Sequence, residues 1–292
     1  MRTYKPTAVL IAVLGLSTFG HAKNKDGVDT VKKAVERSTL NQPGTKPFHL
    51  KAVLAPSRDS DRESNQTGQV ESFESARTYF ERGRRVGFPA AGNGPPYSLH
   101  AVFQAKVKGK VEEGQYVDTW QSDGEWRREA SIGKSRYVRA RHGEKYYRLA
   151  EGPDAELLRL VLRVMEPIPA IDTFMESDWR IKRDTVDGVR TLRVLTGYEH
   201  PDGTLDPEQA RGFWFDDAGK LVKTYFAGIE TRRSHFENFG GAEVARQIRV
   251  LSNGAVGMLI QVTDLSPAGT VAADAFQLHG HEWTRRFTDE VR

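Results

Sequence analysis

Apolar and polar residues alternate along most of the chain between residues 97 and 263, in short runs rich in β-branched and aromatic side chains. Alternation with a period of two is typical of strands that have one buried face and one solvated face. A first run occupies residues 96–103. The later runs that we predict as strands are 113–120, 126–132, 137–140, 145–149, 179–185, 189–196, 213–215, 221–226, 231–236, 244–251 and 256–263.

Turn sequences separate these runs. Asp-Gly and Asn-Gly pairs supply the positive φ that tight hairpins require. The predicted turns lie at 108–110, 123–124, 133–134, 142–143, 187–188, 202–203, 218–219 and 253–254. The strands outnumber what a flat sheet holds without curling. The pattern therefore predicts a mainly β (α+β) protein built on a curled antiparallel sheet, a half-barrel covered by a few helices.

Three segments show helical rather than strand spacing. Residues 26–40 and 69–85 are predicted to be amphipathic helices, the second because apolar residues from Val70 to Phe80 recur every three or four positions. Residues 153–165 are apolar around most of a helical circumference and are followed by two prolines. We expect this last helix to be buried against the concave side of the sheet.

The first 22 residues have the order of a secretory signal peptide. Arg2 and Lys5 precede the apolar stretch 8–19, and small residues end at Ala22. We predict cleavage near Ala22 and a periplasmic or secreted bacterial protein; an uncleaved anchor is the alternative. A lipid anchor is excluded because no cysteine follows the apolar stretch.

The chain is expected to divide into a signal peptide (1–22), an N-terminal helical segment with one strand and a polar loop (23–95), and a β half-barrel domain (96–292). Residues 47–54 in the N-terminal segment resemble 96–103 position by position. A partial duplication and a chance similarity both explain this likeness, and the sequence leaves the two open.

Composition excludes several classes of function. The chain has no cysteine, which excludes disulfides, thiol catalysis and thiolate metal sites. Its formal net charge is +4, and removal of Arg2 and Lys5 with the signal peptide brings the charges closer to balance. Basic residues alternate with acidic ones along most of the chain, whereas a nucleic-acid binder concentrates them on one face. We therefore expect no nucleic-acid partner.

Several strand-and-turn segments resemble a known family of exported bacterial proteins, the LolA-like carriers of outer-membrane lipoproteins. The resemblance covers roughly residues 97–290, and the segments that carry it are 116–120, 125–129, 213–221, 238–241, 248–250 and 261–265. It implies an incomplete barrel with helices over its open side and an apolar cavity for acyl chains. A subset of the family carries a TonB-type C-terminal domain, which we do not expect here because the predicted half-barrel domain extends to Arg292. No binding residue is carried over.

Candidate chemistry is sparse. His279-Gly280-His281 would place two imidazoles on one face of a strand, but no further histidine is adjacent, so a surface or strand-end role is favoured. Asp216-Asp217 directly precedes a glycine turn, where aspartate is expected for local reasons. The sequence contains no nucleophile elbow, phosphate loop, dinucleotide fingerprint or zinc-protease motif. We predict no catalytic residue, no metal site and no cofactor.

Tryptophans are the most distinctive apolar residues, and most lie within predicted strands. Core packing and the lining of a lipid-sized cavity both account for them, and the sequence does not fix the direction in which Trp126 points. The five tryptophans are Trp120, Trp126, Trp179, Trp214 and Trp283.

These observations favour a non-enzymatic periplasmic binding or carrier protein for an apolar, acyl-chain ligand or a lipoprotein. One alternative is a structural or interaction module of the cell envelope, linked to a TonB-type system and using a sheet edge to bind a protein partner. A second alternative is an exported hydrolase with an unrecognised site. A dry cavity would favour the carrier, and a filled core would favour the interaction module. A polar cleft with convergent carboxylates would favour the hydrolase.

Overall fold

The computed structural model describes residues 69–283, except for residues 72, 90–93, 108, 167, 169–178, 253 and 273. The predicted signal peptide, the helix predicted at 26–40 and the strand predicted at 47–54 lie outside the described residues. The question of a duplicated strand therefore stays open.

The described part of the chain is dominated by strands. The strands are β1 (Gln69–Glu71), β2 (Tyr97–Val107), β3 (Lys110–Ser122), β4 (Glu125–Ile132), β5 (Ser135–His142), β6 (Lys145–Glu151), β7 (Trp179–Val186), β8 (Val189–Thr196), β9 (Arg211–Asp216), β10 (Leu221–Phe226), β11 (Ile229–Phe239), β12 (Ala242–Ser252), β13 (Ala255–Pro267) and β14 (Glu282–Trp283). Two helices accompany them, α3 (Phe73–Gly87) and α4 (Ala155–Met165).

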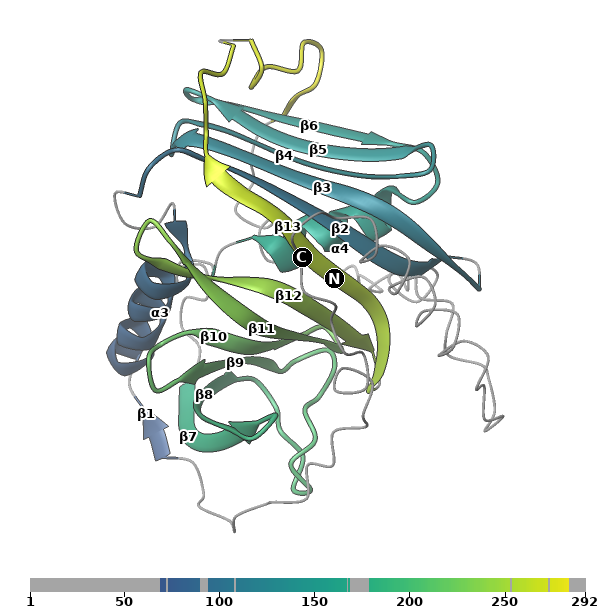
Figure 1. Cartoon of the computed structure of the whole chain (residues 1–292). Coiled ribbons are helices and arrows are strands. Elements are labelled where there is room, and N and C mark those ends of the chain that lie inside the picture. Colours follow the sequence, from purple (N-terminus) through teal and green to yellow (C-terminus); the bar gives the residue numbers. More distant parts are fainter. Residues whose placement is uncertain are drawn as a thin grey trace, which may run out of the picture.

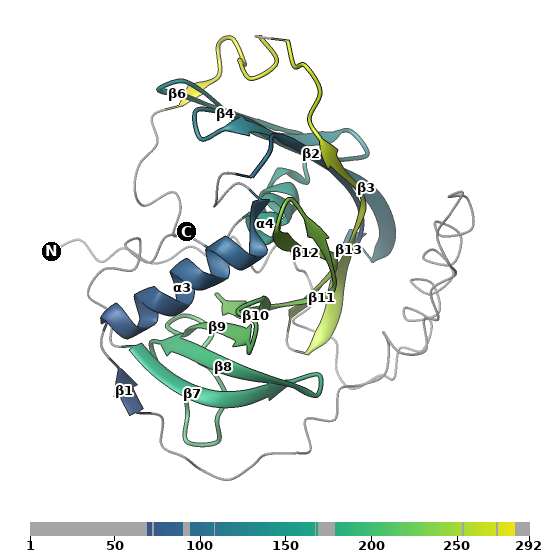
Figure 2. The same ribbon diagram turned by 60° about the vertical axis from the view of Figure 1, so that its left-hand side comes forward.

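All strands belong to one antiparallel, 14-stranded sheet in the order β1-β7-β8-β9-β10-β11-β12-β13-β2-β3-β4-β5-β6-β14. The sheet has two free ends, so it is curled but not closed (Figure 1). Seen from the side it forms a C, in which β2–β6 make one arm and β7–β9 the other (Figure 2). Both helices lie on the inner, concave side of the C. The fold class predicted from the strand pattern is confirmed.

Hairpin turns fix the register between neighbouring strands. At the β7–β8 turn both Asp187 and Gly188 have positive φ, 50° and 80°, as the mirror-image turn of a two-residue hairpin demands. Ala227 and Gly228 make a similar turn between β10 and β11, with φ values of 51° and 73°, although alanine gives no turn signal in the sequence. Every strand predicted from alternation within the described residues is present, in most cases with one to three further residues at an end.

The helix predicted at 69–85 is corrected at its start. Residues 69–71 form the short strand β1, which pairs with β7 through Gln69 opposite Ile181 and Glu71 opposite Trp179. The helix begins only at Phe73 and runs on to Gly87. Val70 fits the helical spacing by coincidence, because one apolar residue suits either period. Backbone pairing with β7 decides its conformation.

Each helix covers its own part of the concave face. Phe80 of α3 is fully buried, and its ring centroid lies 4.6 Å from that of Phe213, 5.5 Å from Trp179 and 5.9 Å from Phe215. This cluster fills the arm made by β7–β9. A larger apolar cluster joins α4 to β2–β5 and β11–β13. The burial predicted for the helix at 153–165 is present.

Candidate ligand-binding face

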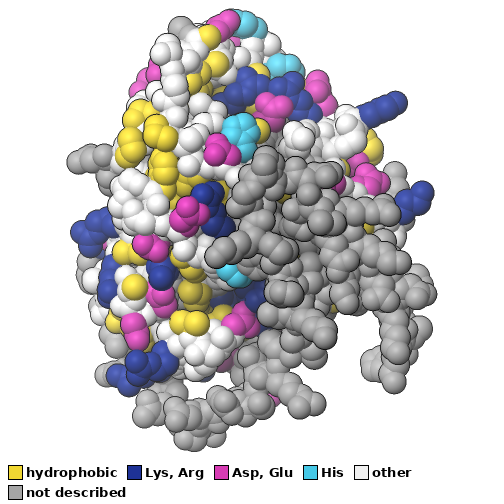
Figure 3. Space-filling model, viewed as in Figure 1, with side chains coloured by type: hydrophobic (Ala, Val, Ile, Leu, Met, Phe, Trp, Pro, Cys, Tyr) yellow, Lys and Arg dark blue, Asp and Glu magenta, His cyan; other side chains and the backbone are white. Residues whose placement is uncertain are grey.

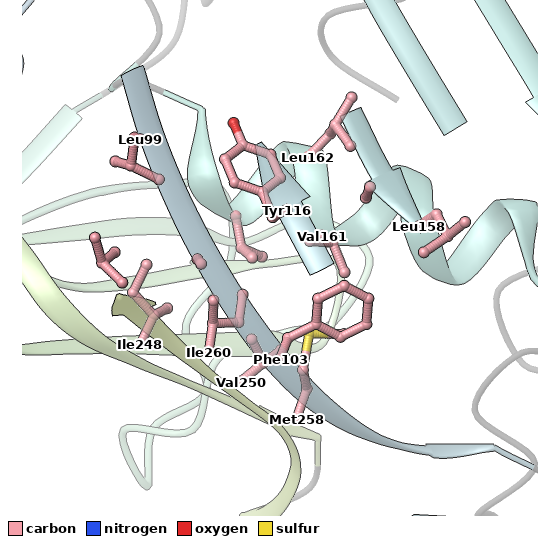
Figure 4. Close-up of a cluster of buried hydrophobic side chains, with 14 of the residues drawn as sticks. Leu99, Phe103, Tyr116, Leu158, Val161, Leu162, Ile248, Val250, Met258 and Ile260 are labelled. Carbon is pink, nitrogen blue, oxygen red and sulfur yellow. The ribbon is translucent and has the colours of Figure 1, made fainter. Parts of the chain in front are cut away.

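The concave face beside α4 is lined by apolar side chains from both halves of the sheet. Figure 4 shows Leu158, Val161 and Leu162 of α4 lying among side chains of β2, β3, β12 and β13. All of the residues labelled there are buried: Leu99, Phe103, Tyr116, Leu158, Val161, Leu162, Ile248, Val250, Met258 and Ile260. These side chains are packed against α4 and form the filled apolar core beside which the candidate site lies.

Polar contacts anchor both ends of α4 to the sheet. At the start, the Ser135 hydroxyl lies 3.0 Å from Asp154 Oδ2 and accepts the Asp154 backbone N–H at 3.1 Å. At the end, Arg233 of β11 donates to the Val164 carbonyl at 3.0 Å, where the helix dipole favours a cation. Burial lowers the pKa of Arg233 to about 10. The helix is thereby held in a fixed position over the sheet.

A buried charged cluster lies next to the apolar surface. Asp118 of β3 and Arg128 of β4 face each other across the strands and form an ion pair, with 3.3 Å between Arg128 Nε and Asp118 Oδ2. The Tyr97 hydroxyl donates to the same oxygen at 3.2 Å. Only 4% of the Asp118 side chain and 10% of the Arg128 side chain are exposed. Arg128 also lies over the ring of Trp126, 4.9 Å from its centroid.

Glu166, directly after α4, connects this cluster to the helix. Its carboxylate pairs with Arg139 of β5 and lies 3.8 Å from Arg128 Nη1. Burial raises the pKa of the Asp118 carboxyl, an effect that the neighbouring Arg128 guanidinium opposes. Burial likewise raises the pKa of the Tyr97 hydroxyl well above its usual value. Because Asp118 and Tyr97 are enclosed, they are better placed to position the arginines than to exchange protons with a ligand.

An aromatic row crosses the concave face beside the charged cluster. Its members are cross-strand neighbours on six strands from β2 to β14, and side chains so placed are in contact range. Tyr97 and Trp120 are stacked at 5.8 Å, and Tyr146 meets Trp283 edge-on at 6.4 Å. This aromatic row consists of five aromatic residues and one arginine that lies between two of them: Tyr97, Trp120, Trp126, Arg141, Tyr146 and Trp283.

The structure thus shows which tryptophans lie on the concave face and which are buried in the core. Trp126 points to the concave face, where it is half-buried beside the main apolar cluster. Trp120 and Trp283 belong to the same row. Trp179 and Trp214 are 0% and 1% exposed and pack in the arm made by β7–β9. Sequence reasoning missed the row, because the cross-strand register that aligns its members is not visible in any single strand.

The other residues considered from the sequence do not form a site. His279 and His281 are exposed in the segment before β14, and the His281 carbonyl accepts the Arg148 backbone N–H at 3.0 Å. Asp216 Oδ1 accepts the Lys220 backbone N–H at 2.7 Å, so this aspartate holds the β9–β10 turn. Within the described residues, no group of three or more histidine or acidic side chains is placed to hold a metal ion.

The visible surface is mixed in charge. On the face of Figure 3, basic and acidic side chains are interspersed, and no single-sign patch dominates it. Among the residues that the structure describes, no helix is long and apolar enough to cross a membrane.

No protein-family model matches this sequence, and no curated protein does. Solved structures similar to the chain include a DUF1329 family protein from Desulfovibrio piger, 12% identical with a TM-score of 0.48, covering 70% of this chain and 97% of that one. A LolA superfamily protein from Nitrosomonas europaea is 10% identical with a TM-score of 0.44, over 70% of this chain and 97% of its own. A domain from Vibrio parahaemolyticus named for outer membrane lipoprotein sorting is 10% identical with a TM-score of 0.44, over 69% and 94%. A LolA superfamily protein is among these similar structures, and it belongs to the family that the sequence segments resemble.

Proposed function

We propose that this chain is an exported, non-enzymatic binding or carrier protein, and that it holds an apolar, acyl-chain ligand on the concave face of its sheet beside α4. The observation that carries this proposal is the aromatic row. The large rings of Trp126, Tyr146 and Trp283 remain only half-buried. The Trp126 ring also packs against the main apolar cluster. Apolar surface left accessible on the inside of a curled sheet is suited to an apolar ligand.

The charged groups near this face support binding rather than chemistry. The Asp118 carboxylate is enclosed and engaged by Arg128 and Tyr97, so it is not placed to reach a substrate. The carboxylate of Glu166 is engaged by Arg139. A general acid or base must lie within hydrogen-bond reach of the reacting group. We therefore favour a binding protein over a hydrolase.

A fluorescent fatty acid provides the test. Purified mature protein should bind dansyl-undecanoic acid, and Trp126→Ala should weaken that binding about tenfold, or ~1.4 kcal/mol, because a large ring is removed from the contact surface. Tyr198→Ala is the matched control, since Tyr198 is 48% exposed in the loop between β8 and β9. Circular dichroism and melting curves should show that both variants are folded.

Binding no better than that of an unrelated β protein would contradict the carrier proposal. An envelope interaction module would then be the better interpretation, and the ends of the sheet would be examined for a protein partner. Equal loss of binding in the Trp126 and Tyr198 variants would place the ligand elsewhere on the molecule.

Export is the second part of the proposal, and it rests on the order of charged, apolar and small residues in 1–22. When the full chain is expressed in a Gram-negative host, N-terminal sequencing of the periplasmic fraction should begin at Lys23. Ala22→Arg should block cleavage, because the cut requires a small residue at that position. Intact protein beginning at Met1 in the membrane fraction of the unmodified chain would contradict the prediction.

A further inference from the structure

We propose that the ligand is an anionic amphiphile, and that its acidic head group binds the β5–β6 end of an arginine row that crosses β4, β5 and β6. This inference rests on the proposed function, because it names the ligand class for the same concave face. The arginine row consists of Arg128, Arg139 and Arg148, with Arg141 beside it in the aromatic row.

The register places these guanidinium groups side by side. Arg128 lies directly opposite Arg139, and Arg139 lies directly opposite Arg148. Side chains in such positions have Cβ atoms about 4.5–5.5 Å apart, and like charges placed so are destabilising. An arrangement of this kind needs anions close by.

The described acidic residues satisfy only one end of the row. Asp118 and Glu166 pair with Arg128 and Arg139. Arg148 has an exposed side chain and no carboxylate partner within the part of the chain that the structure describes. The carboxylate near Arg141 is that of Glu144, at 3.8 Å and with 97% of its side chain exposed. Positive charge is therefore in excess at the β5–β6 end of the row.

The aromatic rings orient the guanidinium groups of this end. Arg148 lies over the ring of Trp283, 4.9 Å from its centroid, and Arg139 lies 5.7 Å from the same centroid. Arg141 lies over Tyr146 at 5.0 Å. A guanidinium stacked on a ring keeps its N–H edge available for an oxyanion, which it can bind through two parallel hydrogen bonds.

Apolar side chains border the row on both sides. One side is the cluster beneath α4, which includes Tyr116, Ala130 and Tyr137. The other side is the aromatic row with Trp126 and Trp283. The first side is buried, whereas the rings of Trp126 and Trp283 are partly exposed. A head group that pairs with the arginines would thus leave its acyl chain against these rings. A small free anion would pair with the arginines but would leave the rings of the aromatic row uncovered.

A second basic row, on the opposite face of the sheet, shows the contrast. This row runs along cross-strand neighbours of β7–β12, and each of its cations has a carboxylate partner. The nitrogen-to-oxygen distance is 3.0 Å between Lys182 and Glu199, 2.9 Å between Lys223 and Glu230, and 2.6 Å between Arg249 and Asp187. That row is neutralised within the protein. Its cations are Lys182, Arg193, Lys223, Arg232 and Arg249.

The test compares head groups on one chain length. Binding of dodecanoate, dodecyl phosphate and dodecyl maltoside is measured by calorimetry below their micellar concentrations, with inorganic phosphate as a fourth ligand. Wild-type protein should bind both anionic amphiphiles at least about tenfold more tightly than the maltoside, as expected for one charge-assisted contact. The double variant Arg141→Gln/Arg148→Gln should lose about tenfold for the anionic ligands and leave the maltoside within about twofold.

Arg190→Gln is the matched control, because Arg190 lies on β8 with 88% of its side chain exposed. It should bind all ligands like wild type. Equal affinity for anionic and neutral amphiphiles, or an unchanged preference in the double variant, would overturn the head-group proposal while leaving the carrier proposal intact. Displacement of dodecyl phosphate by equimolar inorganic phosphate would overturn it in favour of a free-anion site. Failure of all three amphiphiles to bind would overturn the carrier proposal itself.

Discussion

Leu158→Asp is expected to lower the free energy of unfolding by about 4 kcal/mol or more. Leu158 is 0% exposed and lies within the apolar cluster that joins α4 to the sheet. The substitution removes a fully buried leucine and places a carboxylate among apolar side chains. Val161→Asp should behave similarly, because Val161 is also 0% exposed. For a domain of this size such a loss lowers Tm by about 10 °C.

Arg159→Asp provides the control on the same helix. The Arg159 side chain is 41% exposed and pairs with Glu156 at 2.8 Å. Loss of this surface ion pair and the new like-charge neighbour should together change stability by less than about 1 kcal/mol. Urea unfolding followed by tryptophan fluorescence measures all three variants. Wild-type-like unfolding of Leu158→Asp would show that α4 is not packed against the sheet.

The strands were the most predictable part of this protein. Two-residue alternation between Asp-Gly, Asn-Gly and other glycine turns is a local signal, and it locates β3–β13 from residues a few positions apart. The ends of strands were harder, because charged residues such as Lys106, Lys110 and Glu112 continue the ladder by backbone pairing alone. The strand β14 has two residues, Glu282 and Trp283, which is too short for any periodicity.

The candidate site was less predictable, because it depends on register. The polar residue in Tyr116-Val117-Asp118-Thr119-Trp120 stands in phase with two aromatic residues, so it points to the same face as they do. Arg128 has the same relation to Trp126. A charged residue in phase with aromatic residues, as Asp118 and Arg128 are, indicates a buried ion pair. Their alignment across the hairpin, and the approach of Glu166 from beyond α4, required the three-dimensional structure.

Arg128→Leu is expected to lower the free energy of unfolding by about 3–5 kcal/mol, the cost of leaving one partner of a buried ion pair uncompensated. The change leaves the Asp118 carboxylate, 4% exposed, with hydroxyl donors but without its cation. Asp118→Asn in the same chain replaces that carboxylate by a neutral amide. The double variant should therefore recover at least half of the loss, and a double-mutant cycle measures the coupling. Arg136→Leu is the matched control on β5, because the Arg136 side chain is 40% exposed in its pair with Glu129 and should contribute less than about 1 kcal/mol.

The deficit of Arg128→Leu should also depend on pH, in a direction that the pKa of Asp118 fixes. Burial raises that pKa above its value in the unfolded chain, and removal of Arg128 takes away the main opposing influence. A carboxyl with a raised folded-state pKa destabilises the fold increasingly as pH rises from about 4, the unfolded value, through the folded value. Below this range the group is protonated in both states and the penalty vanishes. The difference between Arg128→Leu and wild type should thus be large at pH 7 and smaller at pH 4 in urea unfolding, and Asp118→Asn/Arg128→Leu should lack this dependence. A deficit of equal size at both pH values would mean that Arg128 stabilises the fold through its packing on Trp126 rather than through its charge.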